Sequence, residues 1–149
     1  MSAQVWLGLR NTPPSNMPFD CVAEVHSSGS STTVLVVDDE PLIADTITAI
    51  LIAHGFFAEA AYGGEDAIRV AENLRPDIVL SDVMMPRMSG IQMAIQIRAA
   101  LPDTRIVLLS GQASTAEMMR LAAADGHEFE LLAKPIHPEE LIMRLREPQ

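Results

Sequence analysis

From residue 33 onward, two patterns of apolar and polar residues alternate along the chain. Short apolar runs such as residues 34–37 are typical of strands buried on both faces. Longer stretches with apolar residues three and four apart, such as the one that begins at Pro41, are typical of helices. The predicted strands cover residues 34–37, 57–61, 77–82, 105–109 and 129–133, and the predicted helices cover 41–54, 63–74, 90–100, 113–124 and 138–146.

This strict alternation of strand and helix predicts an α/β fold. Strands that are apolar throughout need cover on both faces, which favours a parallel sheet between two layers of helices. Right-handed crossovers then give a doubly wound arrangement. A ligand site is expected beyond the carboxyl ends of the strands, where the winding direction reverses.

The first 32 residues differ from the rest. Pro13, Pro14 and Pro18 lie close together, and residues 27–33 have the composition of a flexible linker. We expect residues 1–32 to be a disordered or weakly ordered extension and residues 33–147 to be one domain with no output domain after it. Two explanations of the extension stay open: a start codon assigned too early, or a docking peptide that uses Val5, Trp6 and Leu7.

Composition narrows the function. The formal charge of −10 argues against a direct nucleic-acid partner, because phosphate backbones are bound by an excess of Lys and Arg. A single cysteine, Cys21, rules out an internal disulfide and favours a reducing compartment. No apolar run approaches the roughly 20 residues that span a bilayer, and the N-terminus is a poor signal peptide. The expected location is the cytoplasm, without membrane contact.

Polar and charged residues follow four of the five predicted strands at their carboxyl ends. Asp38 and Asp39 follow the first strand, Asp82 ends the third, Ser110 ends the fourth, and Lys134, the only lysine, follows the fifth. Each alone has a simpler explanation, since an acid can cap a helix and a serine can begin a turn. Chance is a poor explanation for all of them at one edge of the sheet, so a functional site is predicted there.

This set of groups suits phosphoryl transfer to a carboxylate. Three clustered carboxylates repel one another unless a cation intervenes, and Mg²⁺ with oxygen ligands fits that need. A carboxylate beside a metal ion and an ammonium group can attack a phosphoryl group and form an aspartyl phosphate. The metal, the lysine and the hydroxyl would then stabilise the charge on the transferring oxygens.

With these residues in place, residues 33–146 resemble the response-regulator receiver domains of two-component signalling. The resemblance rests on the string of residues 34–41 with its acidic pair, on residues 76–86 running on to Gly90, on Ser110 and on the pair Lys134–Pro135. It implies a flavodoxin-like five-stranded parallel sheet in the order 2-1-3-4-5. It also implies a signalling switch that catalyses only its own phosphorylation and dephosphorylation.

The resemblance also implies roles for individual residues. Asp82 would accept the phosphoryl group, and Asp39 and Asp82 would bind Mg²⁺ directly. Asp38 would act mainly through water, and the backbone carbonyl of Met84 would be a further metal ligand. Lys134 would pair with the phosphoryl oxygens, through a cis bond to the following proline.

A further implied role belongs to Ser110, which would move to hydrogen-bond the phosphoryl group. The donor would be a sensor histidine kinase or a histidine phosphotransfer protein. Phosphorylation would change the surface offered to an unknown downstream protein. Apolar residues on the last two helices are expected to belong mostly to the core, with a few that could form a homodimer face: Met118, Met119, Leu121, Ile142, Met143 and Leu145.

Two departures from the family pattern stand out. The family usually has an aromatic residue three positions before the lysine, where this chain has Leu131, and the nearest aromatic residue is Phe129. Either Phe129 takes that role or the output surface moves differently. Gly111 leaves room for a phosphodonor, and Gln112 is a candidate for tuning dephosphorylation.

Three other functions fit the sequence less well. A phosphohydrolase of the haloacid-dehalogenase type needs a second acid two residues after its nucleophile, where Met84 stands after Asp82. A flavodoxin-like cofactor binder needs a phosphate-cradling loop after the first strand, where Asp38 and Asp39 would instead repel phosphate. A receiver that serves as an unphosphorylated scaffold is disfavoured by the full set of site residues.

Overall fold

The chain is seen in a computed structural model that describes residues 31–111 and 114–148, with backbone only at 114 and 115. The chain divides into two units, Met1–Ser30 and Ser31–Gln149, and the second is described here by itself. Residues 1–30 and 112–113 lie outside the described residues. The expectations for the extension, for Cys21 and for Gln112 therefore stay predictions.

Strands and helices alternate through the unit as the sequence predicts. Their order and bounds are β1 (Thr33–Val37), α3 (Pro41–Ala53), β2 (Phe57–Ala61), α4 (Gly64–Leu74), β3 (Ile78–Asp82), α5 (Gly90–Ala100), β4 (Arg105–Ser110), α6 (Ser114–Ala124), β5 (Glu130–Ala133) and α7 (Pro138–Arg146).

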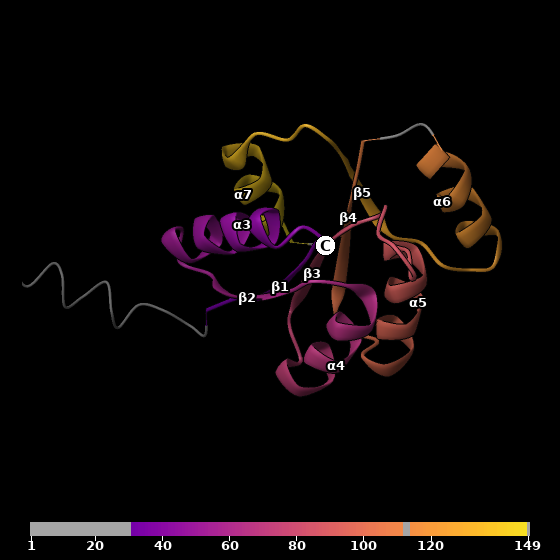
Figure 1. Cartoon of the computed structure of the whole chain (residues 1–149), viewed down its shortest axis with the longest axis horizontal. Coiled ribbons are helices and arrows are strands. Elements are labelled where there is room, and N and C mark those ends of the chain that lie inside the picture. Colours follow the sequence, from indigo (N-terminus) through magenta and orange to yellow (C-terminus); the bar gives the residue numbers. More distant parts are fainter. Residues whose placement is uncertain (1–30, 112–113, 149) are drawn as a thin grey trace, which may run out of the picture. The chain divides into compact units, whose positions relative to one another are not determined.

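All strand pairs are parallel, and the sheet has the order β2-β1-β3-β4-β5. Figure 1 shows α3 and α7 on one side of the sheet and α4, α5 and α6 on the other. The predicted doubly wound sheet with strand order 2-1-3-4-5 is therefore confirmed. Winding reverses between β1 and β3, which places their carboxyl ends side by side.

Two apolar cores result because side chains alternate between the faces of each strand. On β1, Leu35 and Val37 pack with the helices α4, α5 and α6. Val34 and Val36 point the other way and pack with α3 and α7. β3 and β4 divide in the same manner, so the apolar runs that predicted buried strands supply both layers at once.

The end of the sheet opposite the strand carboxyl ends is held by Arg105, the first residue of β4. Its guanidinium binds Glu130 Oε2 at 2.7 and 2.9 Å. It also donates to carbonyl oxygens at the end of α7, those of Arg144 at 3.1 Å and Glu147 at 2.8 Å. A single buried arginine thus ties β4, β5 and the last turn of α7 together.

The structure departs from the predicted elements mainly near β5. Phe129 was predicted to lie in this strand, but β5 begins one residue later, at Glu130. The Phe129 ring is partly buried against the core on the α4–α6 side. Apolar character marks a buried residue in a strand and in a loop alike, so the pattern could not locate this boundary.

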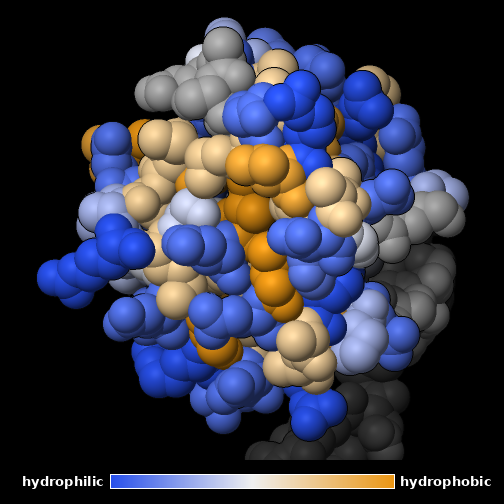
Figure 2. Space-filling model, turned by 90° about the vertical axis from the view of Figure 1, so that its right-hand side faces the viewer, coloured by the Kyte–Doolittle hydropathy of each residue, from blue (hydrophilic) through white to orange (hydrophobic). Residues whose placement is uncertain are grey.

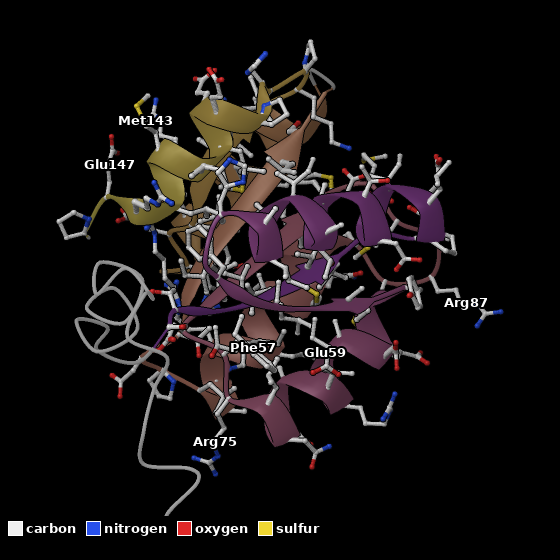
Figure 3. All side chains as sticks on the ribbon, turned by 90° about the vertical axis from the view of Figure 1, so that its left-hand side faces the viewer. Phe57, Glu59, Arg75, Arg87, Met143 and Glu147 are labelled. Atoms are coloured by element: carbon white, nitrogen blue, oxygen red, sulfur yellow. The ribbon has the colours of Figure 1, made fainter. Side chains whose placement is uncertain are left out.

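Residues on the last two helices divide as expected between core and surface. Ile142 and Leu145 are buried, and Met118 and Met119 are partly buried against the core. Two of the apolar residues named on these helices are exposed instead: Leu121 and Met143. Figure 3 shows Met143 on the outer side of α7, and Phe57 and Glu59 along the edge strand β2.

Candidate functional site

The three acids predicted for the site come together in the structure. Asp38 and Asp39 follow β1, and Asp82 is the last residue of β3, the neighbouring strand. Each offers a carboxylate oxygen, and these oxygens all lie within 4.8 Å of one another. Residues 43 positions apart in sequence therefore share one cluster because parallel neighbours end at the same edge.

Lys134 lies beside this cluster, just after β5. Its Nζ is 3.2 Å from Asp82 Oδ2, and both side chains are more than half buried. This ion pair places the ammonium group of Lys134 at the carboxylate oxygens of Asp82. The Lys134–Pro135 peptide bond is cis, as the sequence comparison led us to expect.

Asp38 is the most buried acid of the cluster, with 3% of its surface exposed. Burial raises the pKa of its carboxyl above the ordinary value of 3.8, and the hydrogen bond from the Glu40 N–H (2.9 Å) lowers it. The charge of Asp82 raises this pKa further, Lys134 lowers it and Asp39 raises it. The cluster thus carries uncompensated negative charge that a cation would relieve.

Ser110 ends β4. The backbone N–H of Lys134 donates a hydrogen bond to the Ser110 carbonyl oxygen at 2.7 Å, so the two residues are neighbours. Ser110 is buried, with 7% of its surface exposed. Beyond it, a Cβ added at Gly111 would lie 3.6 Å from the Lys134 Cβ, an ordinary contact. The space around Gly111 would therefore also accept a Cβ, so packing alone does not require glycine at this position.

Sequence reasoning did not single out the close packing behind Asp82. A Cβ at Gly90, the first residue of α5, would lie 2.2 Å from the Asp82 carbonyl oxygen. The Gly90 N–H also donates to the Val83 carbonyl at 2.8 Å. Only glycine fits here, so the start of α5 rests directly on the backbone of Asp82. A glycine at a helix start was the available signal.

Met84 lies in the loop after β3. Its backbone N–H donates to Asp82 Oδ1 at 3.3 Å, and its side chain is exposed. Oδ1 of Asp82 thus accepts from the loop after β3, while Oδ2 faces Lys134. The expected role of the Met84 carbonyl as a metal ligand stays a prediction.

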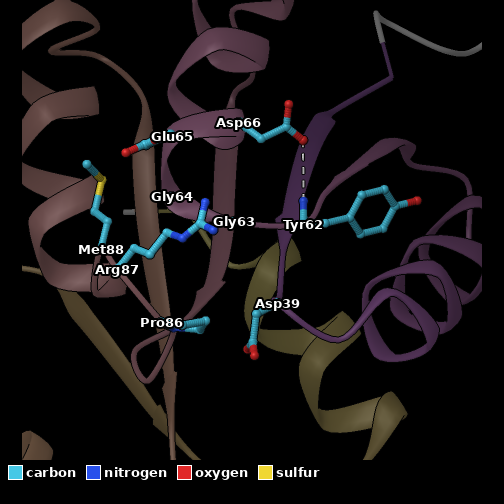
Figure 4. Close-up of a pocket in the computed structure, with 9 residues that line it drawn as sticks. All are labelled: Asp39, Tyr62, Gly63, Gly64, Glu65, Asp66, Pro86, Arg87 and Met88. Carbon is cyan, nitrogen blue, oxygen red and sulfur yellow. Dashed lines mark hydrogen bonds between the residues drawn. The ribbon is translucent and has the colours of Figure 1, made fainter.

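A cleft of about 480 Å³ opens beside Asp39, between the start of α4 and the loop from β3 to α5 (Figure 4). Gly64 forms part of its wall, and a Cβ there would come within 2.9 Å of the Met88 side chain. On the rim, the Tyr62 hydroxyl donates to Asp45 at 2.6 Å. Arg87 extends from the loop toward solvent (Figure 3). Of the three acids in the cluster, Asp39 lines this cleft.

The donor set fits a hard divalent cation. Carboxylate oxygens from three residues, one of them buried with a raised pKa, form an oxygen-rich and negatively charged cluster. Mg²⁺ prefers such ligands and completes its shell with water and phosphate oxygens. The residues present are therefore able to bind a metal ion.

The position three residues before the lysine is occupied by Leu131, whose side chain is 40% exposed on β5. Phe129 is not free to take its place, since it packs against the core and against a guanidinium, that of Arg98. The Arg98 Cζ lies 4.9 Å from the Phe129 ring centroid. The departure expected from the sequence is thus real.

Among the described residues, no helix is long and apolar enough to cross a membrane.

Comparison with known proteins places these features in a family. The family model for the response regulator receiver domain matches residues 34–146. A probable transcriptional regulatory protein, TcrX of Mycobacterium tuberculosis, is 35% identical over 120 residues, which cover 80% of this chain and 50% of that protein. The response regulator MprA of a Mycobacterium species is 36% identical over 113 residues, covering 76% and 48%. The chain spans about half the length of these relatives.

Solved structures agree. The chemotaxis protein CheY4 of Vibrio cholerae superposes with a TM-score of 0.70 at 30% identity, and the match covers 78% of this chain and 98% of that one. A receiver domain protein from Clostridium thermocellum gives a TM-score of 0.67 at 29% identity, covering 75% and 89%. Acid cluster, lysine and sheet order together with these matches show that the chain belongs to the response regulator receiver domain family of two-component systems.

Proposed function

We propose that residues 33–147 form a receiver domain that accepts a phosphoryl group on Asp82 with the help of Mg²⁺. The observation that carries this proposal is the position of Lys134 Nζ, 3.2 Å from Asp82 Oδ2, at the edge of a cluster of three carboxylates. Within the cluster, Asp82 is the acid that contacts both the lysine and the Met84 N–H. These contacts support Asp82 as the proposed nucleophile.

The proposed step balances as a simple displacement. An oxygen of the Asp82 carboxylate forms a bond to phosphorus, and the bond from phosphorus to the donor breaks. The donor leaves as imidazole from a phosphohistidine, or as acetate from acetyl phosphate. Mg²⁺, held by Asp39 and Asp82 with Asp38 acting mainly through water, would neutralise charge on the phosphoryl oxygens.

Protein side chains supply the remaining stabilisation. Lys134 moves from the Asp82 carboxylate to a phosphoryl oxygen, and the Ser110 hydroxyl donates a hydrogen bond to another. Both residues border the site already, because β4 and β5 are paired at Ser110 and Ala133. The step therefore needs small movements of side chains and of the segment after β4.

The proposed phosphodonor is a sensor histidine kinase or a histidine phosphotransfer protein. The phosphorylated surface would bind a downstream protein or a second copy of the chain. Exposed apolar side chains on the last elements support such a face: Leu121, Leu131 and Met143 are 60%, 40% and 63% exposed. Isolated apolar residues are common on surfaces, so the face is proposed from their occurrence on the three successive elements α6, β5 and α7.

The proposal is tested by following phosphorylation with acetyl phosphate and Mg²⁺ in wild type and in Lys134→Ala. Loss of the ammonium group should slow phosphorylation on the order of 100-fold, as removal of one transition-state stabiliser does. Chelation of Mg²⁺ should abolish it. The matched control is Arg144→Ala, which removes an exposed cation on α7 away from the cluster. Equal rates for both variants would contradict the proposed role of Lys134.

A further inference from the structure

Arg98 joins two parts of the fold that are distant in sequence. It lies in the last turn of α5, and its guanidinium donates to the carbonyl of Glu128 at 3.0 Å. Its Cζ lies over the ring of Phe129 at 4.9 Å. The His127 ring stacks parallel to Phe129 at 6.3 Å. The end of α5 therefore contacts the last two residues before β5, Glu128 and Phe129.

The Arg98–Phe129 contact is incompletely satisfied. The Arg98 Nε–H is buried and has no hydrogen-bond partner among the described residues. A buried donor without an acceptor costs free energy that the rest of the contact must offset. The unpaired Nε–H therefore offsets part of the free energy that the contact contributes.

The other end of α5 lies at the phosphorylation site. Gly90, its first residue, packs against the carbonyl of Asp82, and Ser89 and Gln92 form a capping box that fixes the first turn. A helix of 11 residues transmits a displacement at one end to the other as a rigid element. Asp82 and Phe129 are thus connected through α5.

In its described part, the α6 helix has few buried side chains. Among the described side chains of α6, only Ala122 is buried, and Leu121 is 60% exposed. Figure 2 shows a band of apolar surface on the side of the molecule that carries α5 and α6. Movement of Ser110 toward a phosphoryl group would pull on the segment that leads into α6. The contacts of Arg98 with Glu128 and Phe129 would oppose that movement at the connection between α6 and β5.

We propose that the contact of Arg98 with Glu128 and Phe129 is a latch that stabilises the unphosphorylated state and opens on phosphorylation. The latch involves Phe129, which α5 contacts through Arg98, and it does not involve Leu131. The inference rests on the proposed phosphorylation of Asp82. Arg98 acts here as a positioning residue and makes no contact with the phosphoryl group.

The latch has a thermodynamic consequence that can be measured. A contact present only in the resting state lowers affinity for any ligand that favours the active state, so its loss must raise that affinity. Beryllofluoride with Mg²⁺ is a suitable probe because it imitates a phosphoryl group on a carboxylate. Arg98→Gln should bind it about two- to fivefold more tightly than wild type, the factor that one partly exposed cation–π contact represents.

Controls separate the latch from general destabilisation. Arg120→Gln removes an exposed arginine on α6 that forms an ion pair with Glu117, and should bind like wild type. Arg98→Lys keeps the charge and should fall between wild type and Arg98→Gln. Phe129→Leu keeps an apolar side chain, removes the ring, and should also tighten binding; it replaces Arg98→Gln if that variant does not unfold cooperatively.

Each outcome decides the matter. Tighter binding in Arg98→Gln and Phe129→Leu, with Arg120→Gln unchanged, supports the latch. Unchanged or weaker binding in both latch variants, with normal binding in wild type, overturns the latch and leaves the proposed function standing. No beryllofluoride binding by wild type overturns the proposed function, and the latch with it.

Discussion

At the scale of single residues, the site depends on close contacts that leave little freedom. Gly90 is the clearest case, since its backbone touches the carbonyl of the phosphoacceptor candidate Asp82. Asp38 is a second case, because its buried carboxylate accepts a hydrogen bond from the backbone N–H of Glu40. Substitutions of single residues around the site should therefore change stability through steric clashes or through changes in charge.

Gly90→Ala should destabilise the fold by about 1–3 kcal/mol, the usual cost of forcing an extra carbon into a filled site. The reason is the 2.2 Å approach of the new Cβ to the Asp82 carbonyl oxygen. Urea denaturation measures the change. Gly111→Ala is the control, because its Cβ would make only an ordinary contact at 3.6 Å. Equal stability of the two variants would show that the loop relaxes freely.

The only tyrosine of the chain reports on the rim of the cleft. The hydrogen bond from Tyr62 to Asp45 raises the pKa of the phenol above its ordinary value of 10.0, and desolvation and the charges of Asp45 and Asp66 act in the same direction. A donated hydrogen bond and nearby negative charge both favour the neutral phenol. Asp45→Asn should therefore bring this pKa back toward 10.0.

Ultraviolet absorbance at alkaline pH follows this ionisation directly. Asp66→Asn serves as the comparison, because the charge of Asp66 is the smallest contribution to the raised pKa. A phenol that titrates at its ordinary pKa in wild type would mean that the Tyr62–Asp45 hydrogen bond is absent in solution.

At the scale of elements, the end of the sheet remote from the site is fastened by Arg105. Arg105→Gln should cost about 2–3 kcal/mol, since charged hydrogen bonds to Glu130 and to the last carbonyls of α7 are lost together. Urea denaturation again measures it. Arg69→Gln breaks an exposed pair with Asp66 and should cost less than about 0.5 kcal/mol. Similar losses of stability in the two variants would mean that the contacts of Arg105 do not stabilise this end of the sheet.

Elements were also the level at which the sequence was most informative. β2, α5 and α7 begin and end where the pattern placed them. The limit lay at boundaries such as Phe129, where an apolar residue packs against the core from a loop. The contact of this ring with Arg98 joins residues 31 positions apart, and no local periodicity can reveal it.

At the scale of the whole molecule, topology assembles the site. Asp38, Asp39, Asp82 and Lys134 could be named from the sequence because parallel strands bring their carboxyl ends to one edge. The distances could not be predicted, nor could the burial of Asp38 or the packing of Gly90 behind Asp82. Those depend on side-chain and backbone packing that a single sequence does not encode in any local pattern.

The central claim is that Asp82 carries the phosphoryl group. The most direct measurement is intact-mass spectrometry after incubation with acetyl phosphate and Mg²⁺, on wild type and on Asp82→Asn, with an active receiver as positive control. The account predicts one phosphoryl adduct on wild type and none on Asp82→Asn, which should keep the wild-type fold by circular dichroism. An adduct on folded Asp82→Asn, or none on wild type while the positive control reacts, would contradict it.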